Sequence, residues 1–221
     1  MAYNYSNISG THKTWFKRKK EMWDIYPDTK QYREILKTVK KSPLNPKYAR
    51  RDYLVFVVMG NLGLRIGEMV LLRREHFESL TNDPPIARVP ALKKRGKQES
   101  YKSIYVHWKV ADVIKKYIAK DLYRTDEFLF PGMTETGNLS SRHMYTIIIS
   151  YFKKCGFTEN YTPHSIRHMV GTRIYEKTGD VAFVRDQLGH SVIGNIGATN
   201  IYIHTSQERA KTNLKKIGYL L

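Results

Sequence analysis

Apolar residues recur at α-helical spacing along most of this chain, and residues that begin or end helices separate the periodic segments. Asp28 and Gln31 have the spacing of a capping box, so the first helix is expected to begin there. Thr162 and Pro163 occupy the preferred cap and first-turn positions of a later helix, which Gly179 is expected to end. The chain is therefore predicted to fold mainly into short, packed helices.

One region has a different pattern. Residues 86–106 are predicted to form a β-hairpin with a basic turn at Lys93 to Lys97. Helices are expected at about residues 28–39, 47–60, 64–73, 108–118, 141–154 and 163–178, in a segment capped by Asp180, and in a last segment where Thr205 and Glu208 have capping-box spacing. The predicted fold class is mainly α with a small antiparallel β-sheet.

The domain organisation follows from length and from the character of the N-terminus. A chain of 221 residues with 41% hydrophobic content is long enough to bury one core. Residues 1–27 are predicted to be a leader, in which the basic run at 17–20 lies among aromatic residues and Pro27 ends the segment. An arm that contacts phosphate or a docking site and a solvated tail both fit this pattern. Residues 28–221 are expected to form the folded domain.

The charge balance points to a polyanionic partner. Lys and Arg number 38 against 20 Asp and Glu, for a formal net charge of +18. Nucleic acid is the leading candidate partner, although a merely soluble or ribosome-associated basic protein also fits this charge.

The compartment is predicted from the cysteine content and from apolar runs. The single cysteine, Cys155, permits no intrachain disulfide and is expected to be a half-buried packing residue. No stretch approaches the roughly 18 apolar residues of a membrane span, and the N-terminus lacks the apolar core of a signal peptide. We expect a cytoplasmic, nucleoid-associated protein without a membrane partner.

Two arginines are suited to bind one phosphate. Arg65 lies in the segment Gly63-Leu64-Arg65-Ile66-Gly67-Glu68, and Arg167 lies in His164-Ser165-Ile166-Arg167-His168. A guanidinium contacts two phosphate oxygens at once and keeps its charge, so two of them would replace a metal ion. Glu68 is placed to hold Arg65, although an Arg and Glu at this spacing also form ordinary surface pairs.

His164 and Arg167 are three residues apart, so both side chains can face one site. His168 lies four residues after His164, which also fits a zinc pair, but the Glu of a His-Glu-x-x-His arrangement is absent. No metal or other cofactor is therefore expected.

Together with Leu188-Gly189-His190 and Ile201-Tyr202-Ile203-His204, these segments resemble the tyrosine recombinase, or phage integrase, family. The resemblance covers about residues 28–221 and implies the catalytic-domain fold of that family. It implies that Tyr202 is the nucleophile and that Arg65, Arg167, His164 and His190 contact the scissile phosphate, with His168 in support. It also implies that a hairpin lysine protonates the leaving 5′ oxygen. Lys93 and Lys94 are the candidates, with Lys97 as a poorer third. Strand alternation turns only one of the two neighbours to the site, and Lys93 is preferred.

The resemblance further implies a site-specific DNA recombinase that forms a 3′-phosphotyrosyl intermediate without metal or ATP. Four subunits would act on two DNA duplexes through a Holliday junction. The sequence departs from the family in two respects: the loop between His190 and Tyr202 is longer, and the usual N-terminal core-binding domain is expected to be absent. The chain is then either a fragment or a naturally short recombinase. The longer loop is compatible with attack in the same or a neighbouring subunit. A type IB topoisomerase and a catalytically silent DNA-binding protein are the alternatives.

Overall fold

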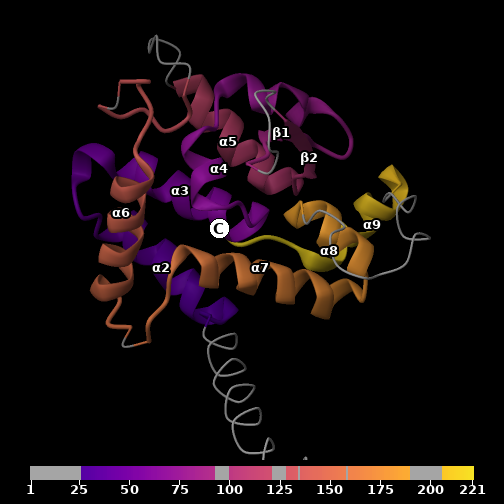
Figure 1. Ribbon diagram of the computed structural model, residues 1–221. Coiled ribbons are helices and arrows are strands. Elements are labelled where there is room, and N and C mark those ends of the chain that lie inside the picture. Colours follow the sequence, from indigo (N-terminus) through magenta and orange to yellow (C-terminus); the bar gives the residue numbers. More distant parts are fainter. Residues whose placement is uncertain (1–25, 93–99, 121–127, 134, 158, 190–205) are drawn as a thin grey trace, which may run out of the picture.

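A computed structural model describes residues 26–92, 100–120, 128–133, 135–157, 159–189 and 206–221 (Figure 1). The predictions for the leader up to residue 25, for the hairpin turn with Lys93 and Lys94, and for His190 and Tyr202 lie outside these residues.

The described residues are mostly helical. The elements are α2 (Thr29–Lys41), a 3₁₀ helix (Pro46–Tyr48), α3 (Ala49–Leu62), α4 (Ile66–Val70), a second 3₁₀ helix (Arg74–Thr81), β1 (Ile86–Pro90), β2 (Tyr101–Tyr105), α5 (Trp108–Lys120), α6 (Ser141–Lys154), α7 (Pro163–Thr178), α8 (Val181–Leu188) and α9 (Gln207–Ile217). The strands β1 and β2 pair antiparallel, with Ile86 opposite Tyr105 and Pro90 opposite Tyr101. The predicted fold class is confirmed.

Local capping explains why most helices begin and end where the sequence predicts. Asp28 accepts a hydrogen bond from the Gln31 amide and Gln31 returns one, which confirms the capping box ahead of α2. Thr162 caps α7, and Gly179 ends it in the left-handed conformation with φ of 64°. These short-range signals set the bounds of α7.

Two boundaries differ from the prediction. The last helix is capped by Ser206, not by Thr205, because the Ser206 hydroxyl accepts from the Arg209 amide. The helix expected at residues 64–73 is only the short α4, and a 3₁₀ helix follows it that the sequence did not predict. The ring of His76 accepts a hydrogen bond from the Arg73 amide at the start of that 3₁₀ helix.

The core is built around α3, which packs against α2, α5 and α7 (Figure 1). Its residues 54–59 are all buried. The Tyr32 hydroxyl of α2 donates to the Phe56 carbonyl across 2.6 Å, and burial raises the pKa of this phenol well above its usual value. The buried helix α3 ends at Leu62 with Gly63 as its C-cap, and Arg65 follows two residues later.

The C-terminal segment docks on its own domain. The Asp180 carboxylate accepts from the Arg209 guanidinium through two bonds of 2.6 Å and from the Asn213 amide across 2.8 Å. Near the C-terminus, the Asn61 side chain donates to the Leu220 carbonyl and accepts from the Leu220 amide, both at 2.8 Å. These contacts fix α9 and the chain end beside α7 and α8, so the segment before α9 has fixed described residues on both sides.

Among the described residues, no helix combines the length and the apolar run that crossing a bilayer requires.

Candidate active site

The Glu68 carboxylate lies at the centre of a cluster of cationic side chains. Arg65 directly precedes α4, and Glu68 stands in its first turn with a side chain only 1% exposed. One Glu68 oxygen accepts from the Arg65 amide at 2.9 Å, and the other accepts from its guanidinium at 3.1 Å. The carboxylate therefore holds both the backbone and the side chain of Arg65, whose own side chain remains 30% exposed.

Arg167 reaches the same carboxylate from α7. Its nearest guanidinium nitrogen lies 4.0 Å from Glu68, and its side chain is 4% exposed. Two of its N–H groups donate to the carbonyls of Gly63 and Leu188, both at 2.6 Å. Arg167 thereby ties the end of α3 to the end of α8. Burial, and then the positive charge of Arg65, lower the pKa of Arg167 to about 10, so the group remains cationic at neutral pH.

Lys102, on β2, is a third cation in this cluster, and the sequence analysis missed it. Its ammonium lies 3.0 and 2.9 Å from the two Glu68 oxygens and 3.3 Å from the Leu188 carbonyl. Burial lowers its pKa, while Glu68 opposes that shift. The period of two along a strand places Lys102 on the same face as the buried Ile104, and this was the available signal.

The cluster has a positive charge surplus. Three cations face one carboxylate within the described residues. Water is largely excluded around Glu68, Lys102 and Arg167, so the charges interact strongly. A positively charged site with a partly exposed guanidinium at its edge suits a phosphate ligand.

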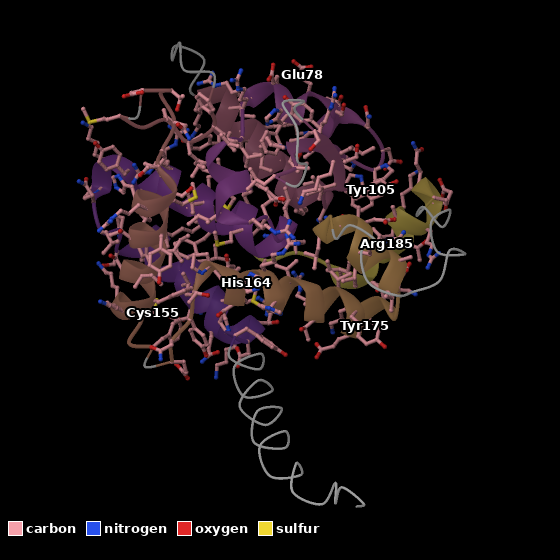
Figure 2. All side chains as sticks on the ribbon, viewed as in Figure 1. Glu78, Tyr105, Cys155, His164, Tyr175 and Arg185 are labelled. Atoms are coloured by element: carbon pink, nitrogen blue, oxygen red, sulfur yellow. The ribbon has the colours of Figure 1, made fainter. Side chains whose placement is uncertain are left out.

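His164 stands on the first turn of α7 (Figure 2), and its pKa is lowered by burial and then by Arg167 and Arg65. The rings of His164 and His168 meet edge to face with their centroids 4.6 Å apart. Burial and the neighbouring His164 and Arg167 likewise lower the pKa of His168. Both imidazoles are therefore neutral at neutral pH. Within the described residues, no three His, Cys, Asp or Glu side chains gather as a potential metal site.

A titration by NMR is expected to place the midpoint of His164 below its ordinary value of 6.5. The folded protein then holds this proton less tightly than the unfolded chain, so the stability contribution is complete above that value and is lost as the pH falls through the lowered one. Arg65→Ala removes one of the nearby charges and should raise the midpoint. A midpoint at or above 6.5 in the unaltered chain would contradict this arrangement.

The remaining candidates, His190, Tyr202, Lys93 and Lys94, lie outside the described residues. The described residue just before His190 is Gly189, the left-handed C-cap of α8, and the Lys102 side chain packs against it. The chain thus leaves the described structure for His190 directly beside the cationic cluster.

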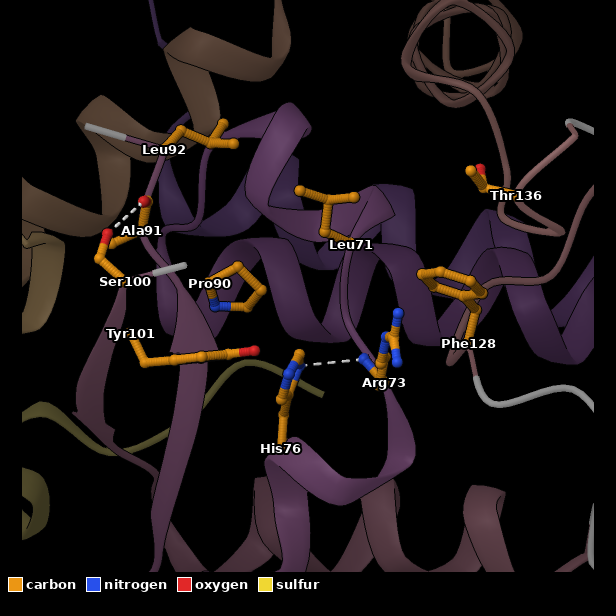
Figure 3. A pocket seen from close by; sticks show the side chains of 10 residues that line it. All are labelled: Leu71, Arg73, His76, Pro90, Ala91, Leu92, Ser100, Tyr101, Phe128 and Thr136. Atoms are coloured by element: carbon orange, nitrogen blue, oxygen red, sulfur yellow. Dashed lines mark hydrogen bonds between the residues drawn. The ribbon is translucent and has the colours of Figure 1, made fainter. Parts of the chain in front are cut away.

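A cavity of about 440 Å³ lies elsewhere, beside the hairpin and the loop that follows α4 (Figure 3). Its lining includes Pro90, Tyr101, Arg73, His76 and Phe128, whereas Arg65, Glu68 and Arg167 do not line it. The candidate site is therefore the charged cluster and not this cavity.

Comparison with known proteins identifies the family of this chain. Residues 27–209 match the Phage integrase family. A tyrosine recombinase of Pseudothermotoga lettingae is 26% identical over 191 residues, which cover 86% of this chain and 61% of that protein. Tyrosine recombinase XerC of Methylobacterium sp. (strain 4-46) is 30% identical over 161 residues, which cover 72% of this chain and 47% of that protein. The chain thus spans about half to three fifths of the length of these relatives.

Solved structures share the fold. The XerA recombinase superposes with a TM-score of 0.62 at 19% identity, covering 86% of this chain and 64% of the other. The XerH site-specific recombinase bound to its difH substrate gives a TM-score of 0.61 at 18% identity, covering 85% of this chain and 49% of the other. With this fold and the match over residues 27–209, the chain belongs to the phage integrase family, the tyrosine recombinases.

Proposed function

We propose that this chain is a site-specific DNA recombinase, which cleaves and rejoins strands through a 3′-phosphotyrosyl intermediate. The observation that carries the proposal is the convergence of Arg65 and Arg167 on Glu68. Arg65 and Glu68 stand at the start of α4, whereas Arg167 comes from α7, which is distant in the sequence. Phosphoryl transfer spreads negative charge over the non-bridging oxygens of phosphorus, and fixed cations stabilise that charge. The cluster supplies such cations.

Arg65 and Arg167 have different tasks in this proposal. Arg167 has five N–H donors, of which two bond the Gly63 and Leu188 carbonyls, so its remaining donors are held in a fixed direction. Arg65 is more exposed and forms the side of the site that a duplex reaches first. The two guanidiniums contact the non-bridging oxygens of the scissile phosphate without a metal ion.

Tyr202 attacks the phosphorus in the first step. Its phenol has an ordinary pKa of about 10, so a base must accept the proton or cations must stabilise the oxyanion. His164 is suited to accept it because its lowered pKa keeps the imidazole neutral. The bond from phosphorus to the 5′ oxygen breaks, and Lys93 or Lys94 protonates that oxygen, while His190 donates to the phosphate.

Rejoining reverses these steps. A 5′ hydroxyl attacks the phosphotyrosyl link, and the phenolate leaves with a proton from the site. The covalent link conserves the energy of the phosphodiester, so ATP is not required. When the attacking hydroxyl belongs to the partner duplex, the strands are exchanged.

The proposed partner is double-stranded DNA, bound by a homotetramer on two duplexes. A formal net charge of +18 supports a partner rich in phosphate. Among structural relatives, a lambda integrase dimer is bound to a COC′ core site, and the Tn1549 transposon integrase is in complex with circular intermediate DNA. These complexes support DNA as the ligand of the same fold.

The proposal is tested with a library of nicked duplexes tiled across the DNA that flanks the chain's own coding sequence. Cleavage next to a nick releases a short strand, so the covalent product accumulates. We expect an SDS-resistant protein–DNA adduct on a subset of duplexes, formed equally well in EDTA, because arginines and not a metal neutralise the phosphate.

The other outcomes identify the alternatives. Duplex binding without any adduct would show a catalytically silent DNA-binding protein. Relaxation of supercoiled plasmids without exchange between two sites would show a type IB topoisomerase. An adduct lost in EDTA and restored by zinc would instead assign metal binding to His164 and His168.

A further inference from the structure

Lys102 is a largely buried cation to which the proposed mechanism assigns no role. Its side chain is 12% exposed, and its ammonium contacts both oxygens of a carboxylate that is itself 1% exposed. Removing an ammonium from water is costly unless it is paired and hydrogen-bonded. A lysine in this position makes contacts that an apolar side chain cannot make.

The hydrogen bonds of Lys102 indicate a role in positioning. An ammonium has three N–H donors. Three acceptors surround it in the structure: Glu68 Oε1, Glu68 Oε2 and the Leu188 carbonyl. The Glu68 carboxylate and the Leu188 carbonyl thereby engage at least two of its three donors, so the protein holds the ammonium in place. The contacts connect three elements, β2, α4 and the end of α8.

Each contact of Lys102 holds a group that also contacts an arginine. Glu68 accepts from Arg65, and the Leu188 carbonyl accepts from Arg167 across 2.6 Å. A displacement of the ammonium would therefore release both the carboxylate that holds Arg65 and the carbonyl that anchors Arg167. Lys102 is the only described side chain that donates to both acceptors.

Gly189 allows this approach. Its φ is +63°, a conformation that favours glycine, and a Cβ at this position would overlap the Lys102 side chain. The lysine lies directly against the backbone that leads to the next residue, His190. The side chain is thus placed to fix the point from which His190 extends.

Building on the recombinase proposal, we propose that Lys102 is a positioning residue, which clamps Glu68 against Arg65 and ties that pair to the end of α8. It holds the guanidinium of Arg65 and the backbone at Gly189 in fixed positions before DNA binds. Such preorganisation acts on the rate of the chemical step, because misplacing a charged group by about 1 Å can cost about a hundredfold.

The kinetic test compares Lys102→Met with Lys37→Met. Lys37 is also paired with a glutamate, Glu34, but it is 66% exposed on α2, so its replacement controls for the loss of an ion pair. At saturating DNA, Lys102→Met is expected to form the covalent adduct about 10- to 100-fold more slowly, with duplex affinity within about twofold of the unaltered chain. Lys37→Met should match the unaltered chain, and Lys102→Arg should recover part of the rate.

Two further experiments distinguish a positioning role of Lys102 from a role as the general acid. If Lys102 acts through Arg65, combining Lys102→Met with Arg65→Ala should slow adduct formation little beyond Arg65→Ala alone.

A duplex with sulfur in place of the leaving 5′ oxygen needs no proton donor, because a thiol has a pKa of about 8.5 and leaves as a thiolate. Recovery of Lys102→Met on this duplex would identify Lys102 as the acid and overturn the proposal. Unchanged kinetics in Lys102→Met would also overturn it.

A labelling experiment tests the clamp without DNA. Acetylation followed by mass spectrometry should modify Lys102 at least about tenfold more slowly than Lys37, because the ammonium is buried and paired. Glu68→Gln should accelerate the labelling of Lys102 and leave that of Lys37 unchanged. If the unaltered chain forms no adduct, the recombinase proposal fails, and labelling decides on the clamp alone: labelling of Lys102 as fast as that of Lys37 overturns it.

Discussion

Replacing Tyr202 by phenylalanine is expected to abolish the covalent protein–DNA adduct and to leave duplex affinity within about twofold of the unaltered chain. The substitution removes one oxygen, the atom that would bond to phosphorus, and retains the ring. The variant is incubated with a duplex that the unaltered chain cleaves, and the covalent adduct is quantified on denaturing gels. A shift in native gels measures the duplex affinity.

Tyr219→Phe is the matched control for Tyr202→Phe. Tyr219 is also close to the C-terminus, but it is 41% exposed and its ring packs against His107. Its replacement should leave the adduct at the level of the unaltered chain. Full adduct formation by Tyr202→Phe would assign the nucleophile to another residue and refute the proposed role of Tyr202.

The two arginines are expected to respond differently to replacement by alanine, although both should slow cleavage by about 100- to 1000-fold. Arg65 is partly exposed, and Glu68 keeps its bond to Lys102 when Arg65 is absent. Arg65→Ala should therefore cost only about 1 kcal/mol of stability. The Arg167 side chain is only 4% exposed. Arg167→Ala removes the side-chain donor of the Gly63 carbonyl and leaves the Leu188 carbonyl with only the 3.3 Å bond from Lys102, so it should cost about 3 kcal/mol or more.

Thermal unfolding and single-turnover cleavage measure the two effects separately. A loss of about 3 kcal/mol corresponds to a fall in Tm of about 6–12 °C for a domain of this size. Arg167→Lys should remain slow and destabilised, because an ammonium cannot reproduce the planar geometry that joins both carbonyls. Equal stability losses for the Arg65 and Arg167 variants would contradict the structural role assigned to Arg167.

Most of the fold could be predicted because its signals are local. The capping box of Asp28 and Gln31, the cap at Thr162 and the glycine at residue 179 each act within a few residues of their own helix. The 3₁₀ helix at Arg74–Thr81 had no such signal. Its hydrogen bond from the Arg73 amide to the His76 ring depends on how the loop packs, and loop packing is a tertiary property.

The candidate site could be predicted only in part, for the same reason. Sequence motifs singled out Arg65, Glu68 and Arg167, and the structure brings these side chains together. Lys102 was missed because its partner Glu68 lies 34 residues away, and no local pattern connects them. The two carbonyls that hold Arg167 were equally invisible, since a backbone acceptor carries no sequence signature.

The central claim is that Arg65 and Arg167 together hold the scissile phosphate in front of Tyr202. A crystal structure of Tyr202→Phe bound to a duplex that the unaltered chain cleaves tests it most directly. The claim predicts both guanidiniums within hydrogen-bond distance of the non-bridging oxygens of one phosphate, at the position where the adduct forms. A scissile phosphate bound away from both arginines would contradict it.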